Sequence, residues 1–216
     1  MHIRWLGHAC FEIKSHSLTV VTDPYDPYTG FHLPAELRAE VVTVSHQHKD
    51  HNNSTAILGE PQIISSTGAI TISGVEFFGL KTFHDTEGGT QRGENTVFKF
   101  TLEDLRLLHL GDLGHQLTND QLEALGEIDI LMIPVGGTYT IDAVTAVTVV
   151  QQLKPKIILP MHYKIPELVF PLDPVSNFLQ VANWSSITRD VLEIDKLSLP
   201  AQPEIILLKP YIIKSV

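Results

Sequence analysis

The sequence predicts an α/β domain made of layered strands and helices. Short apolar strands follow one another through the first half of the chain, and helical patterns alternate with strands in the second half. The 216 residues are enough for one sizeable core and marginal for two, and the sequence contains no internal repeat or linker. We therefore expect a single domain over residues 1–216.

The first half of the chain is predicted to form strands separated by glycine and proline. Residues 41–44 are four consecutive β-branched residues without polar alternation, a pattern typical of a strand that is covered on both faces. A segment rich in proline, tyrosine and glycine, residues 25–34, is predicted to be a loop. The other predicted strands span residues 3–6, 10–14, 17–22, 62–65, 69–72, 75–81, 96–101 and 106–110.

Helices are predicted only in the second half. Thr118 and Gln121 have the spacing of a capping box and predict a helix start. Asp142 predicts the start of a second helix that extends to about Leu153, although valine and threonine lower its helix propensity. The remaining predicted elements are a helix over residues 174–183 and strands over residues 129–134, 156–160 and 204–208.

The composition excludes several classes of protein. Asp and Glu number 25 against 15 Lys and Arg, so a net charge of -10 disfavours nucleic-acid partners. The single cysteine, Cys10, excludes an intramolecular disulfide framework and a cysteine-rich zinc site, and we expect it in the core. Apolar runs fall far short of the roughly 18 residues that span a membrane, and no signal peptide is evident, so we expect a cytoplasmic protein with no membrane partner.

The chain is rich in histidine, with 11 residues, and the densest group lies directly after the predicted strand 41–44. In an extended chain His46 and His48 share a face, so they can hold one ion, whereas Asp50 and His51 on a following turn can reach a second. Imidazole and carboxylate ligands suit zinc, with manganese, iron or nickel as alternatives. A solvated loop with unrelated histidines is the competing interpretation, and four candidate ligands in six positions argue against it.

The order His-x-His-x-Asp-His resembles the signature of the metallo-β-lactamase superfamily. His84, Asp112 and His162 follow later predicted strands, as that family expects, and the segments Trp5-Leu6-Gly7-His8-Ala9 and Thr22-Asp23-Pro24 also resemble it. The chain is most similar to the branch of compact, lid-less zinc-dependent hydrolases that includes the ascorbate-6-phosphate lactonase. The resemblance implies a four-layer αββα sandwich with a dinuclear metal site along one edge of its two sheets.

The resemblance also implies roles for individual residues. His46, His48 and His84 hold the first ion, Asp50, His51 and His162 hold the second, and Asp112 bridges the two. Asp23 orients a metal-site histidine from behind, and His8 faces the site from the adjoining loop. The competing interpretation is that Asp112 and Asp23 are turn residues and that the single histidines are structural.

A site of this kind predicts a metal-dependent hydrolase. Two divalent ions lower the pKa of a shared water, which then attacks a carbonyl or phosphorus centre, and Asp50 is the candidate acid/base residue. Arg92 is a candidate for binding an anionic group of the substrate, His115 for lining the pocket, and Tyr163 for assisting the leaving group. Aromatic residues of the loop 25–34 suit a flat apolar group. We expect a small ester, lactone or phosphoester as substrate, and homo-oligomerisation stays open.

Three alternatives remain at this point. One is a phosphodiesterase or nuclease of the same fold, against which the acidic charge argues. Another is an iron enzyme of oxygen or sulfur chemistry, which shares the ligand pattern. The third is a non-catalytic metal-binding member of the family, which the seven filled ligand positions disfavour.

Overall fold

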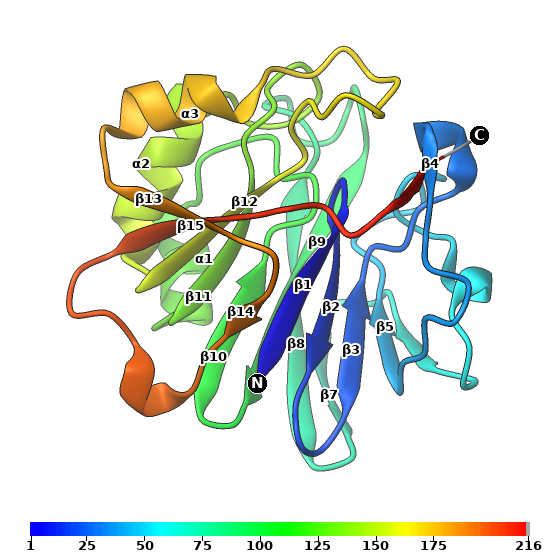
Figure 1. Ribbon diagram of the computed structural model, residues 1–216. Helices are drawn as coiled ribbons and strands as arrows, with labels where there is room; N and C mark the ends of the chain where they lie inside the picture. Colours follow the sequence, from blue (N-terminus) through cyan, green and yellow to red (C-terminus); the bar gives the residue numbers. More distant parts are fainter. Residues whose placement is uncertain (215–216) are drawn as a thin grey trace.

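Two mixed β-sheets form the body of the molecule in the computed structural model, which describes residues 1–214 (Figure 1). The first sheet has six strands, antiparallel on one side and parallel on the other. Their spatial order is β14 (Leu192–Glu193), β1 (His2–Gly7), β2 (Cys10–Lys14), β3 (Thr19–Thr22), β5 (Val41–Thr43) and β6 (Gln62–Ile64).

The second sheet has eight strands and changes from parallel to antiparallel pairing at β10. Their spatial order is β13 (Ser186–Arg189), β15 (Glu204–Leu208), β12 (Ile157–Met161), β11 (Ile130–Pro134), β10 (Leu105–His109), β9 (Glu94–Leu102), β8 (Val75–Phe83) and β7 (Gly68–Ile72). A short antiparallel pair, β4 (Phe31–His32) and β16 (Ile213–Lys214), completes the strands that are described.

The helices lie where the sequence predicts them. The Thr118 hydroxyl accepts a hydrogen bond from the Gln121 amide, and Gln121 Oε1 accepts one from the Thr118 amide, so the predicted capping box is present at the start of α1 (Asn119–Leu125). Asp142 caps α2 (Ala143–Leu153) in the predicted place. The third helix, α3 (Val175–Ala182), packs with α2, and three short 3-10 helices also occur: η1 (Pro27–Thr29), η2 (Ser54–Ala56) and η3 (Lys196–Ser198).

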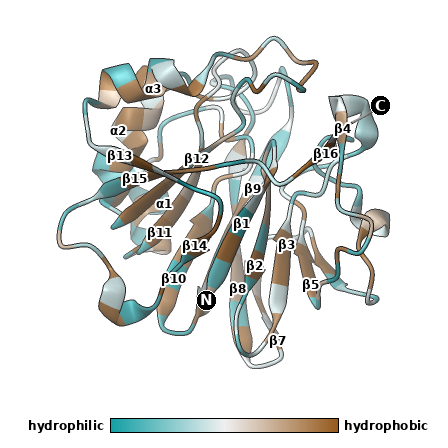
Figure 2. Ribbon diagram, viewed as in Figure 1, coloured by the Kyte–Doolittle hydropathy of each residue, from teal (hydrophilic) through white to brown (hydrophobic). Residues whose placement is uncertain are grey.

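One hydrophobic core joins the two sheets. Apolar residues gather on the strands, as the brown segments in Figure 2 show, and β5 is buried on both faces as its β-branched sequence predicts. Large aromatic side chains from both sheets, including Trp5, Phe11 and Phe98, are fully buried, and Cys10 is buried among them. The sheets are also tied directly, because His109 Nε2 at the end of β10 lies 2.8 Å from the Ala9 carbonyl oxygen.

Two expectations need adjustment. His46 and His48 do not continue the strand: β5 ends at Thr43, and residues 46–51 form bends and a turn closed by the His51 amide and the His48 carbonyl. In the loop 25–34, Tyr25 and Phe31 are buried against each other and are unavailable to a substrate. Within residues 1–214 no helix is both long and apolar enough to cross a membrane.

Candidate metal centre

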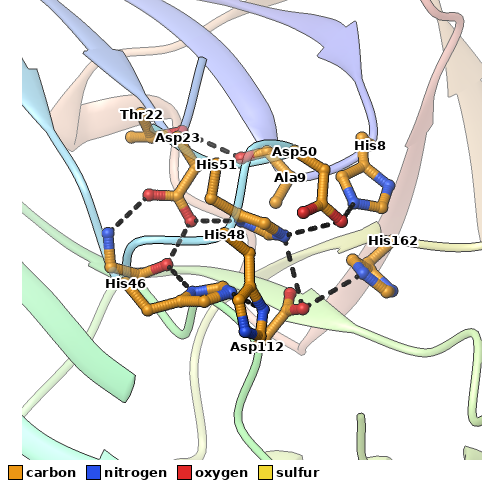
Figure 3. A network of polar contacts seen from close by, with 12 residues as sticks. His8, Ala9, Thr22, Asp23, His46, His48, Asp50, His51, Asp112 and His162 are labelled. Atoms are coloured by element: carbon orange, nitrogen blue, oxygen red, sulfur yellow. Dashed lines mark hydrogen bonds and ion pairs between the residues drawn. The ribbon is translucent and has the colours of Figure 1, made fainter. Parts of the chain in front are cut away.

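Histidine and aspartate side chains gather along one edge of the two sheets, each from a segment that follows the carboxyl end of a strand (Figure 3). The strands β1, β3 and β5 of the first sheet run in the same direction, as do β8, β10 and β12 of the second. Such an edge is where α/β sheets usually place their ligand sites, because the loops after parallel strands meet there. The contributing residues are His8, Asp23, His46, His48, Asp50, His51, His84, Asp112 and His162.

One group in this cluster is formed by three imidazoles. A nitrogen from each of His46, His48 and His84 lies within 4.8 Å of the other two. His46 Nε2 and His48 Nδ1 are 3.0 Å apart, although the residues stand on a bent loop and not on a strand. The structure therefore brings together the three residues predicted to hold a first ion.

A second group adjoins the first and contains one residue more than predicted. Asp50, His51 and His162 lie together, and His8 is part of the same group within 4.8 Å. His8 Nε2 is 3.2 Å from Asp50 Oδ2, and the rings of His8 and His162 have centroids 4.1 Å apart. His8 therefore stands among the candidate ligands themselves, closer than a residue that merely faces the site.

Asp112 lies between the two groups. Its Oδ2 atom is 3.0 Å from His84 Nε2, 3.3 Å from His51 Nε2 and 3.3 Å from His162 Nε2. Asp112 Oδ1 is buried and has no hydrogen-bond partner within residues 1–214. A buried carboxylate oxygen without a donor is costly, so this atom needs a cation or a proton that the side chains do not supply.

The position of Asp112 depends on the residues around it. Gly111 has a φ of +52°, and a Cβ atom there would lie 2.4 Å from Asn95 Oδ1 and 2.5 Å from Ser45 Cβ, so only glycine fits. The buried Asn95 side chain accepts a hydrogen bond from the Asp112 amide and donates to the Leu110 carbonyl. These contacts fix the chain on both sides of Asp112.

Asp23 supports two of the histidines from behind. Its Oδ2 atom is 2.9 Å from His51 Nδ1 and accepts a 2.6 Å hydrogen bond from Ser45 Oγ, which in turn lies 2.9 Å from His46 Nδ1. Although burial opposes ionisation, the hydrogen bond to His51 and the neighbouring imidazoles lower the pKa of Asp23. The structure thus places Asp23 behind His51, in the position predicted for it. Ser45 extends the contact to His46.

Three of these residues have a left-handed backbone without being glycine. The φ angles are +51° at His8, +38° at Asp23 and +53° at His162, and the His162 amide donates to the His8 carbonyl. Each such residue costs on the order of 1 kcal/mol or more and is found mostly at functional sites. Seven other non-glycine residues among residues 1–214 also have a positive φ, so this strain is present at three members of the cluster but is not confined to it.

The electrostatics favour deprotonated ligands. Burial lowers the pKa of His46 to about 3 and that of His8 to about 4, so both imidazoles are neutral at pH 7. The pKa of Asp50 is lowered despite burial, because His8 and His51 stabilise its charge. His51 is the exception: although burial opposes its charge, the carboxylates of Asp112 and Asp23 raise its pKa and so favour a positive charge at this position. Metal ions bind neutral imidazoles and ionised carboxylates.

A cavity of about 490 Å³ opens over the cluster. Its polar floor contains His48, Asp50, His84 and Asp112, and its walls are formed by Tyr28, Gln47, Lys49, Arg92, Tyr139 and Phe170. Arg92 thus lies at the cavity as expected, stacked over the Tyr139 ring at 5.8 Å. The two tyrosines and Phe170 form an aromatic wall, with Phe170 ring centroids 5.7 Å from Tyr28 and 6.4 Å from Tyr139.

Two residues predicted to contact the substrate are not in the lining of this cavity. His115 Nε2 accepts a hydrogen bond from the Phe83 amide, and its Nδ1 lies 2.7 Å from the Gln116 carbonyl oxygen. Tyr163 is buried, with its ring 4.9 Å from that of Trp5. Tyr163 was suggested by its position next to His162, but adjacent side chains commonly point in opposite directions.

Sequence reasoning missed Ser45 and Asn95, as well as Lys49, Tyr139 and Phe170 of the cavity. A single serine or asparagine has no spacing that distinguishes it from surface residues of the same type. The aromatic wall combines residues far apart in sequence, so only the fold reveals it.

Comparisons with known proteins agree with this geometry. The family model for a β-lactamase superfamily domain matches residues 2–162, a range that contains every candidate ligand. A UPF0173 protein of Pyrococcus abyssi is 30% identical over an alignment of 180 positions that covers 76% of this chain and 83% of the relative. A UPF0173 metal-dependent hydrolase of Methanoculleus marisnigri is 30% identical over an alignment of 186 positions that covers 76% of this chain and 81% of the relative.

A solved structure is similar over nearly the whole chain. It comes from Thermotoga maritima and is described as a candidate Zn-dependent hydrolase of the metallo-β-lactamase superfamily. The TM-score is 0.81 and the sequence identity 41%, with 96% of this chain and 97% of the other covered. The predicted α/β sandwich and the predicted superfamily are both confirmed by these matches.

Proposed function

Since the chain belongs to the β-lactamase superfamily and is a metal-dependent hydrolase of that fold, we propose that it uses two divalent ions to hydrolyse a small ester, lactone or phosphoester. The observation that carries the proposal is the position of Asp112, whose Oδ2 atom lies within 3.3 Å of imidazoles from both groups. One carboxylate between two imidazole groups suits a pair of neighbouring ions, which such sites hold about 3.5–4 Å apart.

The residues present fit divalent metal ions. We assign His46, His48 and His84 to the first ion, Asp50, His51 and His162 to the second, and Asp112 to both. The unpartnered buried oxygen of Asp112 and the neutral state of His46 support this assignment. The nitrogen and carboxylate donors favour zinc, with manganese, iron or nickel as alternatives that the same ligands accept.

Asp50 is the acid/base residue in this proposal. Divalent ions at the site would lower the pKa of water and polarise the substrate oxygen. Asp50 lines the cavity and its Oδ2 atom contacts His8, so the carboxylate is held ionised in a fixed orientation. An ionised carboxylate in this place can orient an attacking water and take up its proton.

The cavity supports a small substrate with two kinds of contact. Its volume of about 490 Å³ lies within the roughly 300–1,000 Å³ of small-molecule sites. Arg92 and Lys49 supply positive charge for a carboxylate or phosphate, and the aromatic wall of Tyr28, Tyr139 and Phe170 suits an apolar group.

Metal reconstitution tests the proposal. The protein is stripped with a chelator, reloaded with zinc, manganese or iron, and assayed against lactones, thioesters and phosphodiesters while bound metal is counted by elemental analysis. We expect two ions per chain and hydrolysis that depends on them. Asp112→Ala and Asp50→Ala should abolish hydrolysis, and Asp112→Ala should also lower the metal content.

The matched control is Asp190→Ala, which removes a carboxylate from an exposed ion pair with Lys209 and should change neither readout. Full activity of the metal-free protein, or two ions retained by Asp112→Ala, would contradict the proposal. Activity confined to phosphodiesters would instead favour a phosphodiesterase.

A further inference from the structure

Tyr28 differs from the other aromatic residues of the cavity because its hydroxyl lies near Asp50, the proposed acid/base residue. Its ring packs edge-on against Phe170, and its hydroxyl lies near enough to the Asp50 carboxylate to be affected by that charge. The side chain is still 46% exposed, because it stands at the wall of the cavity that opens over Asp50 and Asp112. A substrate entering this cavity therefore meets the phenol next to the carboxylate.

The backbone of η1 is built to hold Tyr28 in this place. Asp26 begins the turn and accepts a hydrogen bond from the Tyr28 amide, while Pro27 fixes the first φ angle. The Asp26 amide donates to the Lys49 carbonyl, directly before Asp50, at 2.9 Å. The turn is thus attached to the same loop that carries the acid/base residue.

A second attachment ties η1 to the loop of Phe170. The Val169 amide donates to the Thr29 carbonyl at 3.0 Å. Gly30 ends the turn at a φ of +107°, and a Cβ atom there would lie 2.2 Å from the Glu167 carbonyl oxygen, so a larger residue would push the two segments apart. Tyr28 is fixed between two walls of the cavity, and this rigidity is what a preorganised hydrogen-bond donor requires.

We infer that the Tyr28 hydroxyl is a catalytic hydrogen-bond donor to the substrate oxygen that becomes negative during hydrolysis, an inference that rests on the proposed function. In the free protein the hydroxyl shares the cavity with the Asp50 carboxylate, and in the reaction it donates to the oxyanion. No covalent bond to Tyr28 forms or breaks, and the phenol keeps its proton.

The chemistry of the side chain suits this role. A phenol has an ordinary pKa of about 10, so it is a donor at neutral pH. Burial, together with the charge of Asp50, raises the pKa of Tyr28 further. Arg92 and Lys49 also line the cavity, but the Arg92 guanidinium lies over the Tyr139 ring, whereas the charge of Asp50 acts directly on Tyr28.

Tyr28→Phe tests the inference because it keeps the ring and removes only the hydroxyl. Zinc-loaded protein is assayed with p-nitrophenyl acetate and γ-butyrolactone, and its affinity for phenylphosphonate, a tetrahedral anion, is measured by calorimetry. We expect kcat to fall roughly 100-fold, as when one oxyanion donor is removed, with little change in KM. Affinity for phenylphosphonate should fall about 10-fold, since a hydrogen bond to a charged group is lost.

The control is Tyr211→Phe, the same change on a tyrosine that is 51% exposed and lies outside the cavity against Arg4. It should match the wild type in kcat, phenylphosphonate affinity and zinc content. Tyr28→Phe should also keep its zinc, and a loss of zinc would mean that Tyr28 supports Asp50 and does not contact the substrate.

Failure of the inference and failure of the proposed function give different results. If the wild type hydrolyses neither probe, the proposed substrates are wrong, but phenylphosphonate affinity still compares the two tyrosine variants. Equal affinity of wild type and Tyr28→Phe, or an unchanged kcat, would overturn the inference. A wild type that does not bind phenylphosphonate would overturn it as well.

Discussion

Asp23 shows how one buried side chain can set the geometry of a whole site. It is fully buried, contacts His51 directly, and reaches His46 through Ser45. Partners of this kind fix which imidazole nitrogen faces the metal and make that nitrogen more basic. The orientation of candidate ligands for both ions therefore depends on a residue that we do not expect to touch either ion.

We expect Asp23→Ala to weaken zinc binding roughly 10- to 100-fold, the usual cost of losing such a partner. Competition with a chromophoric chelator measures the affinity, and circular dichroism checks that the chain folds. Ser45→Ala removes only the link to His46 and should weaken one ion more than the other. Unchanged affinity in Asp23→Ala would show that the hydrogen bonds to His51 and Ser45 do not matter for binding.

At the residue scale, the sequence could predict side chains that belong to a spaced motif. His46, His48, Asp50 and His51 stand close together in sequence, so their proximity in space follows from the chain itself. His84, Asp112 and His162 could be placed only through the family resemblance. Tyr163 is predicted to face the substrate, but its ring instead packs against Trp5.

Among the structural elements, β10, β11 and β12 are joined by Asp129 at the ends opposite to those that carry the candidate site. The Arg106 guanidinium makes a bidentate ion pair with the Asp129 carboxylate, with both hydrogen bonds at 2.8 Å. Lys196 donates a third hydrogen bond to this carboxylate at 2.8 Å. The Asp129 carbonyl accepts from the amides of Lys156 and Ile157. This residue thus fixes how three neighbouring strands begin.

Replacing Asp129 by Asn should destabilise the fold by about 2 kcal/mol at pH 7, because hydrogen bonds to a charged group are lost from a buried carboxylate. Although burial opposes ionisation, Arg106 and Lys196 hold the pKa of Asp129 below its ordinary value. A carboxyl group whose pKa is lower in the folded than in the unfolded protein stabilises the fold at pH values above its unfolded pKa of about 3.9. This stabilisation is lost progressively as the pH falls from there toward the folded pKa. The difference from wild type should therefore shrink at pH 3.

Urea unfolding of metal-free protein at pH 7 and pH 3 measures this difference. The control is Asp190→Asn, which breaks an exposed ion pair with Lys209 and should cost less than about 0.5 kcal/mol. A difference between Asp129→Asn and wild type that is equal at both pH values would contradict the electrostatic origin.

The main elements were predictable from local patterns, but the short ones were not. Runs of β-branched residues predict the central strands, and side-chain caps predict α1 and α2, since each signal lies within one element. The strands β4, β13, β14 and β16 were missed. Most have only two residues, and all owe their conformation to a partner strand, so their own sequences carry little pattern.

On the scale of the whole molecule, one continuous hydrophobic core underlies both sheets. We propose on this basis that residues 1–216 form a single domain that unfolds as one unit. The fold class followed from the alternation of strands and helices, but the order of strands in each sheet did not. Pairing between distant segments, such as β14 with β1, leaves no local trace in the sequence.

We expect Trp184→Phe to unfold in a single transition. In this variant the remaining tryptophan is Trp5, a buried residue of β1 in the first sheet, whereas far-ultraviolet circular dichroism reports on all elements. The two signals should have the same midpoint in urea. Separate midpoints would show that the sheets unfold independently and would contradict a single domain.

The left-handed backbone at His8, Asp23 and His162 has a consequence for how this protein changes over generations. Glycine or asparagine would adopt these angles more easily, so selection for a robust fold alone would replace all three residues. At each of these positions the side chain that the site needs differs from the residue that the backbone favours, a conflict between stability and activity that is common at functional sites. A lineage that no longer needed the reaction could gain stability by changing these positions first.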